Sequence, residues 1–210
     1  AALNGRLPGS IRAWAAADVS ENFHATHHAG RRSYTYHLHA PAAADGHESH
    51  SDSLADQKSS ISGDEVAHEA ARRLSGEHDF HNFTSDEDGT VRDVSVGVER
   101  DEEFLVVTVS AGGFPRGFVR RLVGVLAEVA VEGQPLSRID EVLGEESLQG
   151  GRGVPRMPAE PLVLTGVDYP GVEFVADEEA VASARGVFGQ RRVGALERLK
   201  VAETVLGGLG

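Results

Sequence analysis

Three arginines stand close together in a segment that carries no acidic residue. Arg116, Arg120 and Arg121 lie within residues 111–127, whereas the whole chain has a formal net charge of −13. A guanidinium stays charged at any working pH, and its planar fork binds a carboxylate or phosphate through two parallel hydrogen bonds. This local reversal of sign predicts an anionic partner. The alternative for Arg120 is a surface ion pair, which contributes only ~0–1 kcal/mol.

The three arginines belong to a predicted helix over residues 114–131. Its apolar residues recur at three- and four-residue steps and form one stripe for burial: Phe118, Leu122, Val125, Leu126 and Val129. Pro115 suits the first helical turn. Arg120 follows Gly117 by three residues and precedes Gly124 by four, so on a helix it shares a face with two residues that lack a side chain. We expect another group to approach this face closely.

The elements that must position this helix predict an α+β fold. Five segments have the apolar patterns of strands: residues 11–19, 32–40, 91–99, 104–111 and 161–169. Three segments have the patterns or caps of helices: residues 64–74 with Asp64 as cap, 137–143, and 177 onwards. Since the third and fourth strands form a hairpin, the mixture favours a largely antiparallel mixed sheet flanked by helices.

The composition is that of a halophilic protein. Asp and Glu number 33 against 20 basic residues, and only Lys58 and Lys200 are lysines. A carboxylate-rich surface stays soluble at molar salt, where the Debye length falls to ~3 Å. A merely acidic mesophilic protein is the alternative. The absence of cysteine excludes disulfides and thiolate nucleophiles and fits a cytoplasmic protein. The absence of long apolar runs predicts a soluble protein without a membrane partner.

Ten histidines raise the question of a metal site. His37 and His39 share one face of a predicted strand, an arrangement that can chelate zinc. No carboxylate or cysteine completes a ligand spacing, and His47 and His50 fall in a predicted loop. We therefore expect surface histidines and no metal.

Five stretches together resemble the TruA-type tRNA pseudouridine synthases, and they occur in that family's order. They are LNGRLPGSIR (3–12), FHATHHAGRRSYTY (23–36), GEHDFHNF (76–83), AGGFPRGFVRRLVG (111–124) and EPLVLTGVDYP (160–170). The resemblance implies a pseudouridine-synthase-like fold, a tRNA partner, a homodimer and no cofactor. It also implies the conversion of uridines at positions 38–40 of the anticodon stem-loop, in which the N1 glycosidic bond breaks and the sugar is rejoined to C5.

The catalytic aspartate of this family stands in a G-R-T-D motif that this sequence lacks. In the family the motif comes before the LN..LP segment, so we expect it to precede Ala1, and the chain resembles the C-terminal two-thirds of the enzyme. The 210 residues alone should then be inactive. A non-catalytic RNA-binding fragment or a degenerate paralogue is the alternative.

The resemblance also assigns roles to individual residues. Arg120 is similar to the arginine that pairs with the catalytic aspartate, which is the two-pronged role that its chemistry suggests. Tyr34 resembles the active-site tyrosine, whose ring can stack on a flipped base. Leu162 resembles the apolar residue that lines the base pocket. Without the family, a core aromatic is an equal reading of Tyr34, and a core residue is the better reading of Leu162.

Four arginines are expected to contact RNA: Arg31, Arg32, Arg116 and Arg121. Along the chain we expect an N-terminal region with central strands (1–40), a flexible acidic, serine-rich loop (41–63), a C-terminal α+β domain of the catalytic type (64–175) and C-terminal helices (176–210).

Overall fold

The computed structural model describes residues 3–41 and 62–209, which group into two compact units. The larger unit is Ala25–Pro170, and the smaller combines Ala1–His24 with Gly171–Gly210. Both units join residues from more than one of the four expected segments. Residues 42–61 of the expected flexible loop, with His47 and His50, lie outside the described residues.

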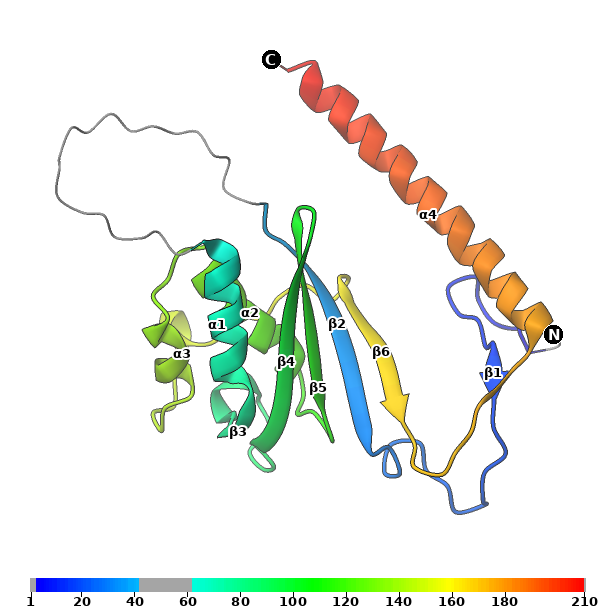
Figure 1. The fold of residues 1–210 in the computed structure, drawn as a ribbon, viewed down its shortest axis with the longest axis horizontal. Helices are drawn as coiled ribbons and strands as arrows, with labels where there is room; N and C mark the ends of the chain where they lie inside the picture. Colours follow the sequence, from blue (N-terminus) through cyan, green and yellow to red (C-terminus); the bar gives the residue numbers. More distant parts are fainter. Residues whose placement is uncertain (1–2, 42–61, 210) are drawn as a thin grey trace. The chain divides into compact units, whose positions relative to one another are not determined.

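The larger unit is built on a five-stranded antiparallel sheet in the order β3-β4-β5-β2-β6 (Figure 1). The strands are β2 (Arg31–His39), β3 (Gly76–Asp79), β4 (Val91–Asp101), β5 (Phe104–Ala111) and β6 (Leu162–Asp168). The alternation that predicted β2 is confirmed, because Tyr36 and Leu38 are buried while His37 and His39 are exposed. The predicted α+β class with an antiparallel sheet is therefore confirmed.

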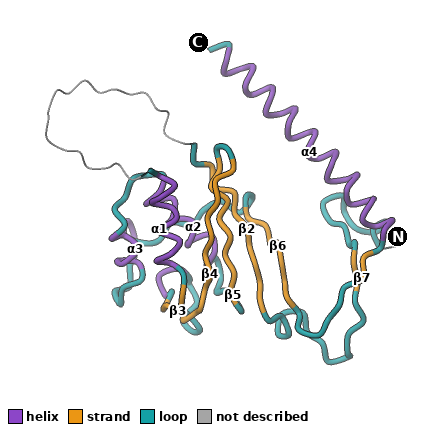
Figure 2. Tube along the Cα trace, viewed as in Figure 1, coloured by secondary structure: helices purple, strands orange, loops and turns teal. Residues whose placement is uncertain are grey.

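Three helices lie on one side of this sheet (Figures 1 and 2). They are α1 (Gly63–Leu74), α2 (Phe118–Ala130) and α3 (Ser137–Val142), and two short 3-10 turns, η1 (His81–Phe83) and η2 (Gly150–Arg152), link the elements. The predicted stripe of α2 is buried, with all five of its apolar residues at 3% exposure or less. It forms a core with residues from the strands and turns: Tyr36, Phe80, Phe83, Val107 and Val109.

Helix α1 begins earlier than expected and has a different cap. Ser62, not Asp64, is the N-cap residue: its side chain accepts a hydrogen bond from the Glu65 amide, and the Glu65 carboxylate accepts one from the Ser62 amide. Asp64 instead forms an ion pair with Arg100 of β4, and the Arg100 hydrogen bond lowers the pKa of its carboxyl. The prediction missed the cap because both residues have side chains that suit the position.

Helix α2 begins at Phe118, four residues later than predicted. Gly117 precedes it in a left-handed conformation with φ of 75°, which interrupts the helical path between Pro115 and Phe118 and favours glycine. Pro115 therefore lies in the turn before the helix, and its carbonyl accepts a hydrogen bond from the Phe118 amide at 3.2 Å.

The smaller unit pairs two short strands and carries one long helix. Strand β1 (Ala15–Ala16) runs antiparallel to β7 (Val175–Ala176), and α4 (Glu178–Gly207) follows. The predicted strand over 11–19 is thus wrong in length, because β7 supplies only two partner residues. The predicted plural C-terminal helices are a single helix, capped by the Asp177 side chain. Among the described residues, no helix has the length and apolar character needed to cross a bilayer.

Candidate active site

A hollow of about 230 Å³ in the larger unit brings together three of the residues singled out from the sequence. Tyr34 comes from β2, Arg120 from α2 and Leu162 from β6. Tyr34 and Leu162 belong to the two strands that pair at this edge of the sheet, where Tyr34 lies opposite Leu164. Phe114, from the segment before α2, and Arg156, from the loop after α3, also line the hollow. Its lining combines apolar and aromatic surface with two guanidinium groups, which suits a planar, partly anionic ligand.

Arg120 is half-buried, and only part of its guanidinium is used by the protein. Its Nε donates a hydrogen bond to the Met157 carbonyl, and in return its own backbone carbonyl accepts one from the Met157 amide at 3.2 Å. No ion pair of Arg120 occurs among residues 3–41 and 62–209. The Nη1 and Nη2 end of the fork therefore remains able to receive a carboxylate through two parallel hydrogen bonds.

Gly124 lets the loop that holds Arg120 reach the helix. A Cβ at Gly124 would clash with the Pro155 carbonyl oxygen and would lie 3.1 Å from the carbonyl carbon and Cγ of Pro155. The predicted close approach on this helix face is therefore confirmed, and the approaching group is the chain's own loop. Since Pro155 is two residues from Met157, this contact also places the carbonyl that holds Arg120.

We expect Gly124→Ala to destabilise the fold by ~1–3 kcal/mol, because the added methyl forces the loop off the helix. Urea unfolding followed by circular dichroism measures the change. Gly189→Ala in α4 is the matched control, since a Cβ there meets nothing within 4 Å. This control should be neutral or slightly stabilising, because alanine favours helix over glycine by ~1 kcal/mol. Equal stability of both variants would contradict the close approach.

The aromatic wall of the hollow is held by ring contacts. Tyr34 and Phe114 meet edge to face, with ring centroids 5.3 Å apart and planes at 79°, and Phe114 lies 5.7 Å from Phe118 in the core. Such contacts fix the orientation of the Tyr34 ring. Two residues further along β2, the Tyr36 hydroxyl donates a hydrogen bond to the Pro158 carbonyl at 3.2 Å. Burial raises the pKa of the Tyr36 hydroxyl, while the nearby Arg120 charge acts in the opposite direction.

The arginines expected to contact RNA lie around Gly117 and at the start of β2. A Cβ at Gly117 would lie 2.9 Å from Nη1 of Arg121 and 3.3 Å from Nε of Arg156, so both guanidiniums approach this glycine. Arg116 is exposed, and its backbone amide donates to the Asp86 carboxylate at 2.8 Å.

Arg31 and Arg32 do not line the hollow. Arg31 is exposed and donates to the Ser95 hydroxyl at 2.9 Å. Arg32 donates to the Gly112 carbonyl at 2.6 Å and to the Thr26 carbonyl. Arg32 thus ties β2 to the segment that leads into Phe114.

Sequence reasoning missed Arg156 and Phe114 as lining residues. Arg156 lies in an irregular loop, where no periodicity tells which way a side chain points. Phe114 was assigned to the helix itself, although the motif AGGFPRGFVRRLVG that contains it was a signal for the site.

No group of three or more His, Asp or Glu side chains in the described ranges 3–41 and 62–209 is arranged to hold a metal ion. His37 and His39 are both exposed on β2, and the His39 ring packs against Phe104 at 5.4 Å.

Residues 70–170 match the profile of a family described as tRNA pseudouridine synthase. This range contains Arg120, Phe114, Arg156 and Leu162, and Tyr34 lies before it.

Comparison with individual proteins extends the similarity from residues 70–170 to the whole chain. A tRNA pseudouridine synthase A from Haloarcula marismortui is 48% identical over 209 residues, which is 100% of this chain and 72% of that protein. One from Natronomonas pharaonis is 48% identical over 201 residues, covering 96% of this chain and 69% of the relative. One from Methanocella arvoryzae is 30% identical over 183 residues, covering 85% of this chain and 60% of the relative. The first two are haloarchaeal, which agrees with the acidic, lysine-poor composition.

Proposed function

The chain belongs to the tRNA pseudouridine synthase A family, and from this premise we propose that its hollow is the site where a tRNA uridine is isomerised. The enzyme class is that of a pseudouridine synthase, an isomerase. The observation that carries the proposal is the convergence of Tyr34, Arg120 and Leu162, which come from three elements and line one hollow.

The reaction sets clear demands on the site. The bond between N1 of uracil and C1′ of the ribose breaks, the base turns, and a new bond forms between C5 and C1′. The proton on C5 is lost and N1 gains one, so the product has the same atoms as the substrate. A base inside a folded tRNA must leave its stack to reach a protein pocket.

The side chains of the hollow meet these demands in different ways. We assign Tyr34 to stack on the flipped base, because its ring is held in place by Phe114. Leu162 supplies an apolar wall that excludes water from one side of the base. We assign Arg156, the second guanidinium in the lining, to the phosphate of the flipped nucleotide.

Arg120 is assigned to hold the catalytic carboxylate. The two terminal nitrogens of its fork match a carboxylate, and the Met157 carbonyl fixes their direction. No aspartate or glutamate lines the hollow in the described part of the chain. We therefore assign the catalytic aspartate to a segment outside these 210 residues. The Haloarcula relative, of which the chain covers 72%, is long enough to contain such a segment.

The arginines around the hollow are assigned to the phosphates of tRNA. Arg116 and Arg121 flank Gly117 at the start of α2, and Arg31 is exposed at the start of β2. Arg32 donates hydrogen bonds to two backbone carbonyls, which positions the segments that carry them. Its positive charge remains available to attract phosphate. Each arginine that neutralises a phosphate releases counterions, which makes binding dependent on salt.

We expect the double variant Arg116→Ala/Arg121→Ala to reduce the slope of log affinity against log salt by ~2, because each lost phosphate contact removes ~1. Fluorescence anisotropy of a labelled tRNA transcript over a salt series measures this slope. Arg72→Ala/Arg73→Ala is the control with the same charge change, since both of these arginines are already paired with Glu69. Parental slopes for Arg116→Ala/Arg121→Ala would point to a structural role instead.

Three broader properties complete the proposal. We assign a homodimeric state, which light scattering of the purified protein tests, and a cytoplasmic location, where tRNA is available. The proposal includes no cofactor, as the resemblance to the family implies.

The site of modification is tested with a whole tRNA transcript and the intact protein. Chemical mapping of pseudouridine along the treated RNA should find conversion at positions 38–40 and nowhere else in the anticodon stem-loop. Conversion confined to another arm of a whole tRNA would overturn the assignment of the anticodon stem-loop while leaving the reaction class in place.

A further inference from the structure

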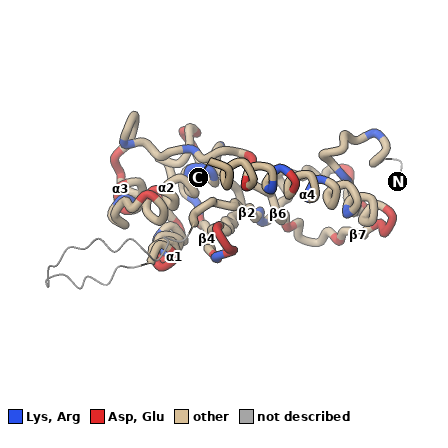
Figure 3. The backbone as a smooth tube through the Cα atoms, turned by 90° about the horizontal axis from the view of Figure 1, so that it is seen from above, with Lys and Arg blue, Asp and Glu red and all other residues tan. Residues whose placement is uncertain are grey.

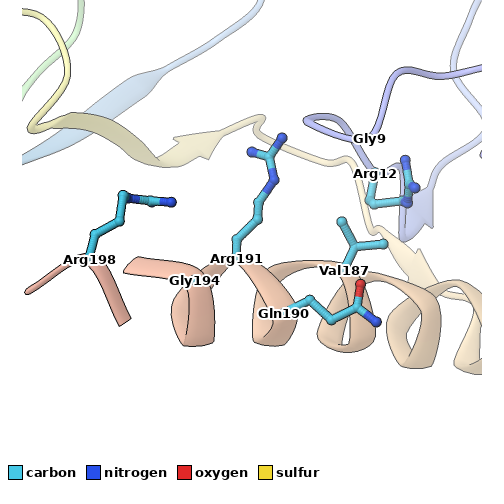
Figure 4. Close-up of a pocket in the computed structure, with 7 residues that line it drawn as sticks. All are labelled: Gly9, Arg12, Val187, Gln190, Arg191, Gly194 and Arg198. Atoms are coloured by element: carbon cyan, nitrogen blue, oxygen red, sulfur yellow. The ribbon is translucent and has the colours of Figure 1, made fainter. Parts of the chain in front are cut away.

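A second basic hollow lies wholly within the smaller unit, between α4 and the segment before β1 (Figure 4). Its volume is about 790 Å³. Three arginines line it, Arg12 from the N-terminal segment and Arg191 and Arg198 from α4, together with Gln190 and two glycines. None of the lining residues in the described part of the chain is acidic. In a chain with a net charge of −13, such a grouping indicates a site for an anion.

The spacing along α4 places the basic residues on one helix face. Val187, Arg191, Gly194 and Arg198 follow at steps of four, three and four residues, which is the period of a single face. Figure 4 shows Arg191 and Arg198 rising from the same side of the helix, with Arg12 on the segment across from them. The Arg198 guanidinium lies next to Gly194, since a Cβ at Gly194 would be in ordinary van der Waals contact with its Nη1 at 3.7 Å. Basic positions recur along α4 in Figure 3.

The guanidiniums of this hollow are not neutralised within the described chain. Arg12, Arg191 and Arg198 take part in none of the ion pairs among residues 3–41 and 62–209. Glu179 shares a separate hollow with Arg12 without forming an ion pair with it. The Arg191 guanidinium stands over the Phe188 ring at 5.8 Å, a contact that holds the cation but leaves its charge in place. Three unpaired guanidiniums and no carboxylate in the lining make this hollow positive, and a positive hollow attracts anions.

Arg12 supplies a second, independent indication of a missing acceptor. Its Nη1 donates to the carbonyls of Pro8 at 3.0 Å and Ile11 at 2.6 Å, which fixes the guanidinium. Its Nε is buried and has no hydrogen-bond partner. A buried donor without a partner is costly, and a charged one more so, so an anion next to Arg12 would stabilise this guanidinium.

We propose that this hollow, which we call the α4 arginine site, binds phosphate oxygens of the tRNA backbone; the choice of tRNA rests on the proposed function. The charges are spread along an open hollow and are not focused on one point, which fits successive phosphates of a polyanion better than one small anion. Guanidinium forks bind phosphate oxygens in pairs, and Gln190 adds a neutral hydrogen-bonding group. The site lies in the smaller unit, whereas the uridine hollow lies in the larger one.

The test is the salt dependence of tRNA binding by the intact protein carrying Arg191→Gln/Arg198→Gln. Anisotropy of a 3′-labelled tRNA transcript should show a slope of log affinity against log salt that is lower by ~2, and a loss of affinity on the order of tenfold at the lowest salt. Arg185→Gln/Arg192→Gln is the matched control, because it removes two arginines from the same helix that do not line the site. It should keep the parental slope.

Further variants of the same arginines complete the test. Arg191→Lys/Arg198→Lys keeps both charges and should recover the parental slope. If the glutamine pair fails to fold by circular dichroism, Arg12→Gln replaces it and should lower the slope by ~1. A parental slope for Arg191→Gln/Arg198→Gln would overturn the proposal. An equal reduction of the slope by this pair and by Arg185→Gln/Arg192→Gln would overturn it as well. Because binding is measured without turnover, absence of isomerisation together with a reduced slope would overturn only the proposed function.

Discussion

Replacing Arg120 by alanine or lysine in the intact protein should lower the single-turnover rate on the order of 10²–10⁴-fold while changing tRNA affinity little. The expectation follows from the proposed pairing of Arg120 with a buried carboxylate. Removing one partner of such a pair leaves an uncompensated charge and costs ~3–5 kcal/mol. Lysine does not rescue the function, because its single ammonium cannot form two parallel hydrogen bonds to a carboxylate.

Rates at saturating enzyme and equilibrium binding must be measured on the same preparations to separate catalysis from affinity. Arg72→Ala is the control, since Arg72 forms an exposed pair with Glu69 on α1, far along the chain from the hollow. Its rate and affinity should match the parent. A near-normal single-turnover rate in Arg120→Ala would remove Arg120 from the active site.

The 210-residue chain alone should have no isomerase activity and should convert no uridine. The reaction needs a group that acts at the bond between sugar and base, and the family's aspartate motif is absent from this sequence. Asp79, in the GEHDFHNF stretch, does not replace it. Its carboxylate accepts a hydrogen bond from the His81 amide at 3.1 Å, and a hydrogen bond from Thr90 is the main cause of its lowered pKa. Chromatography of nucleosides from digested tRNA measures the conversion, with the intact protein as the control.

The parts of the fold that could be predicted are those where burial imposes a period on the sequence. Tyr34, Tyr36 and Leu38 alternate with polar residues, and the strand that they form differs from the prediction by one residue at each end. The apolar stripe of α2 was predicted residue by residue. By contrast, β3 was missed, because Gly76–Asp79 contains no alternating apolar residue and becomes a strand only through its pairing with β4.

The start of α2 and part of the lining of the hollow depend on tertiary contacts, which a local sequence pattern does not reveal. The sequence placed Gly117 inside the helix, as a residue that leaves space on one face. Its left-handed conformation instead makes it the residue before the helix, so α2 starts at Phe118. The hollow was only partly foreseen. Tyr34, Arg120 and Leu162 were found through motifs, whereas Arg156 reaches the hollow because Gly124 allows the Pro155 loop onto α2. A glycine in a helix indicates a close approach but does not tell which segment approaches.

Release of tritium from tRNA labelled at C5 of uridine tests the central claim most directly, because the C5–H bond must break when C5 bonds to the ribose. The intact protein should release tritium in step with pseudouridine formation, its Arg120→Ala variant should release it at least ~100-fold more slowly, and the 210-residue chain should release none. Clear release by the 210-residue chain, or no release by the intact protein, would contradict the assignment of the hollow and of its missing aspartate.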